Sequence, residues 1–147
     1  MAASGPCRVL GKACGLWGDS DLPALLALFR DDVVFSVHGR PSAASIVGKG
    51  MGKALFAHRL EALLDEFAVL DFQLQSVTTD WLWYYARVGY RYRHHASGLI
   101  IDGTMRHQWG FVGDRIAHFE LFHDADRMRA FLDMAALVAA APRGVGR

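Results

Sequence analysis

The chain has 147 residues, the usual length of one domain, and 52% of them are hydrophobic while 21% are charged, which excludes a disordered protein. Sixteen basic and fifteen acidic side chains leave a net charge of +1, which argues against a nucleic-acid-binding surface. No apolar run approaches the roughly 18 residues of a membrane span. We therefore expect a cytoplasmic protein with one domain over 1–141 and a flexible tail over 142–147.

The first half of the chain is predicted to be mainly helical. The N-terminal segment that holds both cysteines forms one helix, and apolar side chains at helical spacing predict two more, over 22–29 and 51–67. The acidic pair at 31–32 ends the first of these two. A short strand over 33–37 and a loop rich in glycine, serine, alanine and proline over 39–50 separate them.

The second half changes to residues typical of strands. Segments rich in valine, isoleucine, threonine and aromatic residues predict an antiparallel meander of four strands, over 69–78, 81–93, 99–112 and 115–123. A closing helix follows over about 125–139. Helices come first and the sheet follows, so the predicted class is α+β.

The turn between the last two strands decides which side chains share a face. A two-residue turn at 113–114 places His107 opposite Glu120, whereas a three-residue loop over 112–114 places it opposite Phe119. A slip of one residue moves a whole strand to the other face, so the apolar pattern favours the three-residue loop. Glu120 then lies on the outer face.

With that register, one concave face collects aromatic and histidine side chains. His107 and His123 point into it beside Trp109, Phe119 and Leu121.

The strand over 81–93 is aromatic on both of its faces. One face carries the alternating set from Leu82 to Tyr92, and the other carries Trp81, Trp83, Tyr85 and three arginines. Arginine and aromatic residues are enriched at protein interfaces, so we expect this outer face to form a homodimer. With a net charge of +1, single-stranded nucleic acid is the weaker interpretation.

Several segments, in their order and spacing, resemble a known family. They are 17–21, 25–35, 47–50, 107–111 and 119–124, and together they extend over nearly the whole chain. The chain resembles SnoaL-like and ketosteroid-isomerase-like proteins of the nuclear-transport-factor-2-like superfamily. The resemblance implies a cone-shaped α+β fold, in which a curved, mainly antiparallel sheet wraps around N-terminal helices and a short C-terminal helix closes the chain.

The resemblance also implies one deep apolar pocket and a homodimer on the outer face of the sheet, but it fixes no reaction. The catalytic residues of two named activities do not carry over. The general base of ketosteroid isomerase falls at Val37, its tyrosine falls near Gly11, and its second aspartate falls at His107. One aspartate of the limonene-epoxide-hydrolase type falls at Leu121.

Histidines are the remaining acid–base candidates. We predict His107 as the central group, assisted by His38 or His123, with His38 turned inward in place of Val37 by a β-bulge. The pair at 94–95 is expected to be solvated in a polar turn. The predicted substrate-binding residues are Trp109, Phe119, Leu121, Phe56, Val37, Tyr84 and Met105.

The predicted function is binding of a small, mostly apolar organic molecule in an aromatic pocket. Catalysis there is cofactor-free isomerisation, cyclisation or dehydration through histidine acid–base chemistry. The alternative is a non-catalytic ligand-binding or dimerisation module. We expect no cofactor and no metal, because no spacing requires the three histidines to act as zinc ligands.

Overall fold

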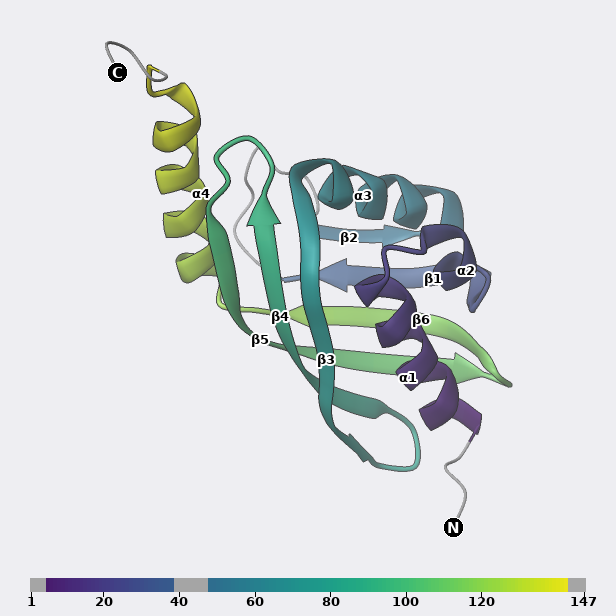
Figure 1. The fold of residues 1–147 in the computed structure, drawn as a ribbon. Coiled ribbons are helices and arrows are strands. Elements are labelled where there is room, and N and C mark those ends of the chain that lie inside the picture. Colours follow the sequence, from purple (N-terminus) through teal and green to yellow (C-terminus); the bar gives the residue numbers. More distant parts are fainter. Residues whose placement is uncertain (1–4, 39–47, 143–147) are drawn as a thin grey trace.

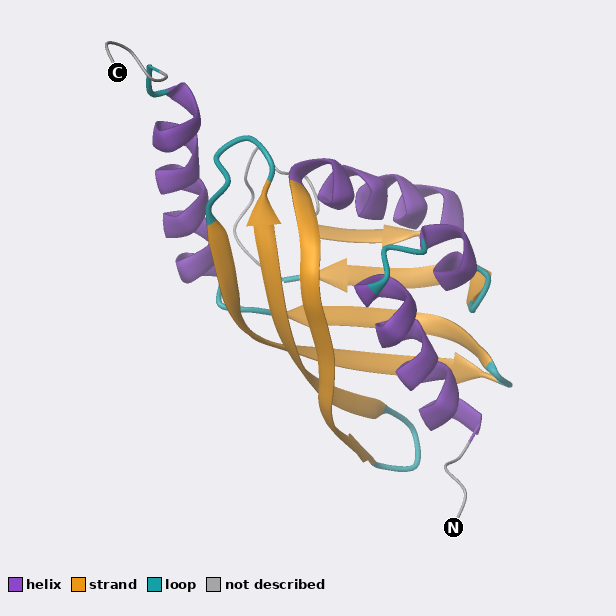
Figure 2. Cartoon of the chain, in the orientation of Figure 1, coloured by secondary structure: helices purple, strands orange, loops and turns teal. Residues whose placement is uncertain are grey.

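Six strands form one curved sheet that holds three helices on its concave side (Figures 1 and 2). The computed structural model describes residues 5–38 and 48–142. The elements in chain order are α1 (Gly5–Gly18), α2 (Leu22–Leu26), β1 (Phe29–Val37), β2 (Gly48–Met51), α3 (Lys53–Glu66), β3 (Phe67–Thr79), β4 (Tyr84–His94), β5 (Ile100–Val112), β6 (Arg115–Phe122) and α4 (Ala125–Ala140).

The strand order in the sheet is β2-β1-β6-β5-β4-β3. The four C-terminal strands pair antiparallel, as the predicted meander requires, and β1 joins it as a parallel neighbour of β6. The predicted α+β class is therefore confirmed, and so is the curved, mainly antiparallel sheet with helices at both ends of the chain. None of the helices in the described part of the chain is long and apolar enough to cross a bilayer.

The prediction of a helix over 22–29 is wrong at its C-terminal end. Helix α2 ends at Leu26, and Phe29 already begins β1, where it lies opposite Ile116 of β6. Asp31 and Asp32 do not end a helix. They lie inside β1 with exposed side chains, where the register against β6 shifts.

The predicted three-residue loop over 112–114 is also wrong. Val112 pairs with Arg115, so the turn has two residues, and Gly113 supplies its positive φ of 62°. A bulge between Gly110 and Phe111 then shifts the register, so that His107 lies opposite Leu121. The two apolar sets still share the concave face, because the bulge shifts the register by one residue, as the predicted loop would, although in the opposite direction: His107 lies opposite Leu121 rather than Phe119.

Two predicted segments lie partly outside the described residues. Of the loop predicted over 39–50, positions 39–47 are not described, while 48–51 form β2. The predicted tail lies beyond the described residues from position 143 onward.

The prediction of a solvated turn at 94–95 is correct for His95, which is exposed in the turn after β4, and wrong for His94. His94 is the last residue of β4 and is buried, with its ring bonded to Ser97 Oγ at 2.9 Å and to Glu66 Oε2 at 3.3 Å. Its ring packs edge-on against Phe67, which begins β3 directly after α3, and against Phe131 of α4. The alternation of β4 continues through position 94 and places this side chain on the buried face.

Candidate functional site

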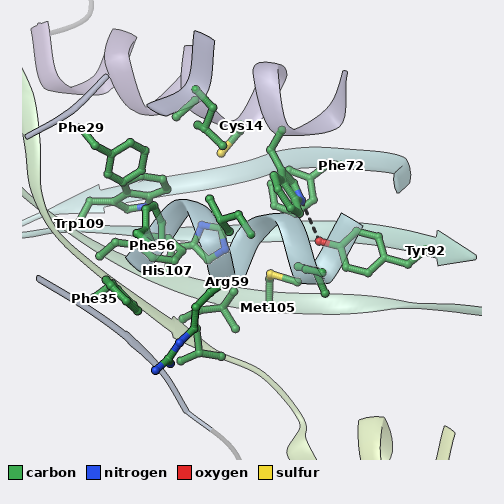
Figure 3. A pocket seen from close by; sticks show the side chains of 18 residues that line it. Cys14, Phe29, Phe35, Phe56, Arg59, Phe72, Tyr92, Met105, His107 and Trp109 are labelled. Carbon is green, nitrogen blue, oxygen red and sulfur yellow. Dashed lines mark hydrogen bonds between the residues drawn. The ribbon is translucent and has the colours of Figure 1, made fainter. Parts of the chain in front are cut away.

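A narrow apolar cavity of about 70 Å³ lies between the concave face of the sheet and the helices (Figure 3). Its side chains come from α1, α2, α3 and five of the six strands. The lining residues are Ala13, Cys14, Trp17, Leu25, Phe29, Phe35, Val37, Phe56, Arg59, Leu60, Leu63, Phe72, Tyr92, Met105, His107, Trp109, Phe119 and Leu121. Ligand pockets usually measure about 300–1,000 Å³, so aromatic side chains fill most of this cone.

His107 is the polar group at the centre of the lining in Figure 3. The residue is 4% exposed, and neither ring nitrogen has a hydrogen-bond partner among the described residues. Aromatic rings surround it, with Phe119 at 5.0 Å, Trp109 at 5.4 Å and Phe72 at 6.0 Å between ring centroids. Burial in this apolar setting lowers the pKa of His107 to about 3, so the imidazole is neutral at pH 7.

Two further nitrogens in the lining are buried without a partner in the part of the chain described. They are the indole Nε1 of Trp109 and the guanidinium Nη1 of Arg59. Among the described residues, five side-chain nitrogens are buried without a partner, and four of them belong to residues of this one cavity. Leaving a buried donor unpaired costs about 1–3 kcal/mol, so the cluster calls for an explanation.

Two other polar side chains of the lining, Trp17 and Tyr92, bind each other. Trp17 Nε1 donates to the hydroxyl of Tyr92 at 3.0 Å, and burial raises the pKa of that phenol. Burial also raises the pKa of the Cys14 thiol to about 12, so it stays protonated at neutral pH. Among the described lining residues there is no carboxylate, and no cluster of possible metal ligands occurs in residues 5–38 and 48–142.

The structure brings seven of the predicted site residues to the cavity: Val37, Phe56, Met105, His107, Trp109, Phe119 and Leu121. Three others do not line it. Tyr84 shares a cross-strand position with Trp109 but packs edge-on against Phe111 at 5.4 Å instead. His123 follows the end of β6 and is half-buried beside the start of α4.

His38 is not turned inward, because no bulge replaces Val37. The backbone N–H of His38 donates to Leu121 O at 2.9 Å, which continues the β1–β6 ladder and leaves Val37 on the cavity side. The His38 ring lies on the other face, stacked on Phe122 at 4.3 Å and bonded to Glu120 Oε2 at 2.8 Å. The second oxygen of Glu120 binds His118 Nε2 at 2.9 Å, so His38 belongs to a surface cluster.

Sequence reasoning missed Arg59, although a signal for it was present. Arg59 lies three residues after Phe56 and four before Leu63, which is the spacing of one helical face. A basic residue on the apolar face of an amphipathic helix faces the core, and Arg59 does so in α3 with its guanidinium 5.5 Å from the Phe35 ring centroid. Phe72 and Tyr92 also line the cavity and were not predicted. They come from the edge strand β3 and its neighbour β4.

Comparison with known proteins gives matches only at the level of structure. No family model matches the chain, and no curated protein matches its sequence. A nuclear-transport-factor-2-like protein of unknown function from Burkholderia pseudomallei superimposes with a TM-score of 0.76 at 16% identity, covering 95% of this chain and 100% of that one. A candidate isomerase from Rhodopseudomonas palustris gives 0.74 at 17% identity, with 93% and 98% covered.

The chain has the nuclear-transport-factor-2-like fold. The resemblance predicted from the sequence is confirmed at that level. TerC, crystallised with polyporic acid, shares the fold with a TM-score of 0.73 at 13% identity, covering 90% of this chain and 99% of that chain. Identities this low show the fold alone, so function rests on the site itself.

Proposed function

We propose that this nuclear-transport-factor-2-like protein binds a small, mostly apolar organic molecule that accepts a hydrogen bond from His107 inside the cavity. The single observation that carries the proposal is the pair of partnerless ring nitrogens of His107, buried at the centre of an aromatic lining. A neutral imidazole has one N–H donor and one acceptor nitrogen. A ligand oxygen bound to that N–H removes the cost of an unpaired donor, and the surrounding rings bind the apolar body.

The size of the cavity limits the ligand. An engineered cavity of about 150 Å³ binds benzene, whereas this one measures about 70 Å³. Entry of an aromatic ring therefore requires half-buried side chains such as Leu60, Leu63 and Phe72 to move. TerC, which shares this fold, was co-crystallised with an organic molecule, polyporic acid.

A matched pair of probes tests the proposal. Acetophenone and α-methylstyrene have the same shape, but only acetophenone carries an acceptor oxygen. We expect acetophenone to bind about tenfold more tightly, because only it satisfies the buried donor. The His107→Leu variant should lose this preference. Binding is followed by calorimetry and by the Trp109 Nε1–H resonance, and equal affinities for both probes in the unmodified protein would contradict the role of His107.

The catalytic form of the proposal is cofactor-free isomerisation, cyclisation or dehydration next to a carbonyl, with neutral His107 donating to the developing oxyanion. The candidate isomerase from Rhodopseudomonas palustris supports this reading by its shared fold. Because burial lowers the pKa of His107 to about 3, its neutral form is present across pH 5–8. Activity carried by that form should be constant over this range and fall only in stronger acid.

Non-catalytic binding is the second candidate function. It is favoured by the lining itself, in which the described residues include no carboxylate and the Cys14 thiol and Tyr92 phenol stay protonated. A ligand that binds without turnover and returns unchanged would support it.

A further inference from the structure

Arg59 is the one formally charged side chain among the described residues that line the cavity. It projects from α3, and in Figure 3 its guanidinium lies beside Phe35 at one edge of the ring cluster. Its Nη1 atom is buried, and an added Cβ at Gly48 would lie 3.5 Å from it, at ordinary van der Waals distance.

No acidic side chain in the described part of the chain balances the charge of Arg59. Within residues 5–38 and 48–142 no carboxylate forms an ion pair with it, and Nη1 has no hydrogen-bond partner there. The segments 1–4, 39–47 and 143–147 contain no aspartate or glutamate in their sequence. Arg30, by contrast, forms an ion pair with Asp32, which is the usual arrangement for an arginine.

We propose that the ligand of this cavity is a small aromatic or unsaturated carboxylic acid, whose carboxylate binds Arg59 while its apolar body packs against the rings around His107. This inference rests on the function proposed above and adds the charge and chemical class of the ligand. It also gives Arg59 a role in specificity.

A carboxylate fits these residues better than a neutral acceptor alone. The guanidinium fork presents parallel N–H donors that match the two oxygens of a carboxylate, and such charge-assisted bonds are roughly twice as strong as neutral ones. A buried guanidinium nitrogen without a partner is costly for the protein, so an anion that supplies the partner for Nη1 gains more than a neutral oxygen does. Arg59 as a whole is only half-buried, so the carboxylate group need not lose all its water.

The rest of the lining suits the apolar part of the same molecule. Phe35 and Phe56 lie 4.9 Å apart between ring centroids, and Phe56 lies 5.9 Å from Phe119, which in turn contacts His107. This chain of rings connects the Arg59 edge with the centre of the cavity. An acid with its carboxylate on an unsaturated body therefore contacts the cation and the rings together.

Benzoate and benzamide are the probes for this inference, because they share shape and differ in charge. At pH 7 we expect benzoate to bind about tenfold more tightly than benzamide, as measured by calorimetry and by the shift of the Trp109 Nε1–H resonance. In Arg59→Met the preference should disappear, and in Arg59→Lys it should persist in part. Arg129→Met removes a positive charge from the exposed face of α4 and should leave the preference intact. Thermal unfolding of each variant checks that it is folded.

The outcomes separate this inference from the proposed function. If acetophenone binds but benzoate gains nothing over benzamide, or if Arg59→Met keeps the preference for benzoate, the acid is ruled out and the neutral-ligand function stands. If none of the four probes shifts the Trp109 resonance or gives heat of binding, both are overturned. A preference for benzoate that depends on Arg59 supports the acid.

Discussion

At the scale of the residue, His107 shows how burial changes the chemistry of a side chain. An imidazole in water has a pKa near 6.5, and the ring cluster lowers that of His107 to about 3. His107 is therefore a weak general base at pH 7, because its ring binds a proton only near pH 3. What remains is a neutral donor and acceptor in an aromatic cavity, which is the chemistry of binding or of oxyanion stabilisation.

The depressed pKa predicts how stability depends on pH. Between pH 6.5 and about 3 the unfolded chain is protonated at His107 and the folded chain is not, so acid favours unfolding. His107 alone should lower the free energy of unfolding by about 1.4 kcal/mol for each pH unit in this range. Urea unfolding of His107→Leu from pH 7 to pH 4 should show a shallower loss than the unmodified protein.

The exposed His58 provides the control for this measurement. His58→Leu should follow the unmodified protein across the same pH range. Parallel curves for the His107→Leu variant and the unmodified protein would mean that His107 is protonated in the folded state, contrary to its burial.

At the scale of the element, two short features decide how the strands meet. The bulge between Gly110 and Phe111 brings Trp109 opposite Phe119 and His107 opposite Leu121, which puts all four on the cavity side. Gly110 also leaves room for Trp83 on the other face, since an added Cβ would come within 2.6 Å of the Trp83 ring. The predicted faces were correct although the predicted turn was not, because the cost of burying a polar face exceeds the cost of one unpaired residue.

Strand β2 depends on a glycine in a similar way. An added Cβ at Gly50 would lie 2.3 Å from Phe35 Cζ and 2.9 Å from Leu55 Cδ2, closer than any real contact. Gly50→Ala should therefore lower the free energy of unfolding by about 1–3 kcal/mol, as overpacking does. Gly11→Ala is the matched control, since Gly11 lies inside α1 with nothing within 4 Å of an added Cβ.

The control should change stability in the opposite direction. Alanine at position 11 restricts the unfolded chain and suits a helix, so we expect a gain of about 0.5–1 kcal/mol. Denaturant unfolding of both variants checks the pair. A Gly50→Ala variant as stable as the unmodified protein would show that β2 can move away from Phe35.

At the scale of the whole molecule, the outer face of the sheet differs from the concave one. Its residues include exposed Tyr85 and Phe122, and Arg87 faces Arg106 directly across β4 and β5. Like charges in opposite positions destabilise a sheet unless another group balances them. A groove of about 550 Å³ on this face is lined by these side chains together with hydroxyls of β3.

The homodimer expected from the sequence stays a prediction, and this face is where it is tested. We expect a dimer at micromolar concentration in sedimentation equilibrium, and Tyr85→Arg should shift it to monomer by adding a third cation beside Arg87 and Arg106. Leu137→Arg is the control, because Leu137 is 74% exposed on α4 rather than on the sheet. A monomer for the unmodified protein would contradict the prediction.

The α+β order of the elements and the buried face of β4 and β5 follow from the sequence alone, because alternation and helical spacing are local properties of the chain. Burial in β4 follows that alternation from Ala86 to Tyr92, and β5 does the same from Ile101 to Trp109. The likeness to nuclear-transport-factor-2-like proteins could also be recognised from the sequence, because it depends on the order of short segments.

Contacts between distant elements set the direction of His38, the partners of His94 and the position of Arg59 in the cavity lining. Each depends on which elements pack together. The β1–β6 ladder turns His38 outward, Glu66 at the end of α3 and Phe131 of α4 contact His94, and Arg59 lies between α3 and the concave sheet. Packing also decides the volume of the cavity. That volume is the small difference between the space enclosed by the sheet and helices and the space filled by the eighteen lining side chains. The volume of the cavity therefore cannot be predicted from local sequence patterns.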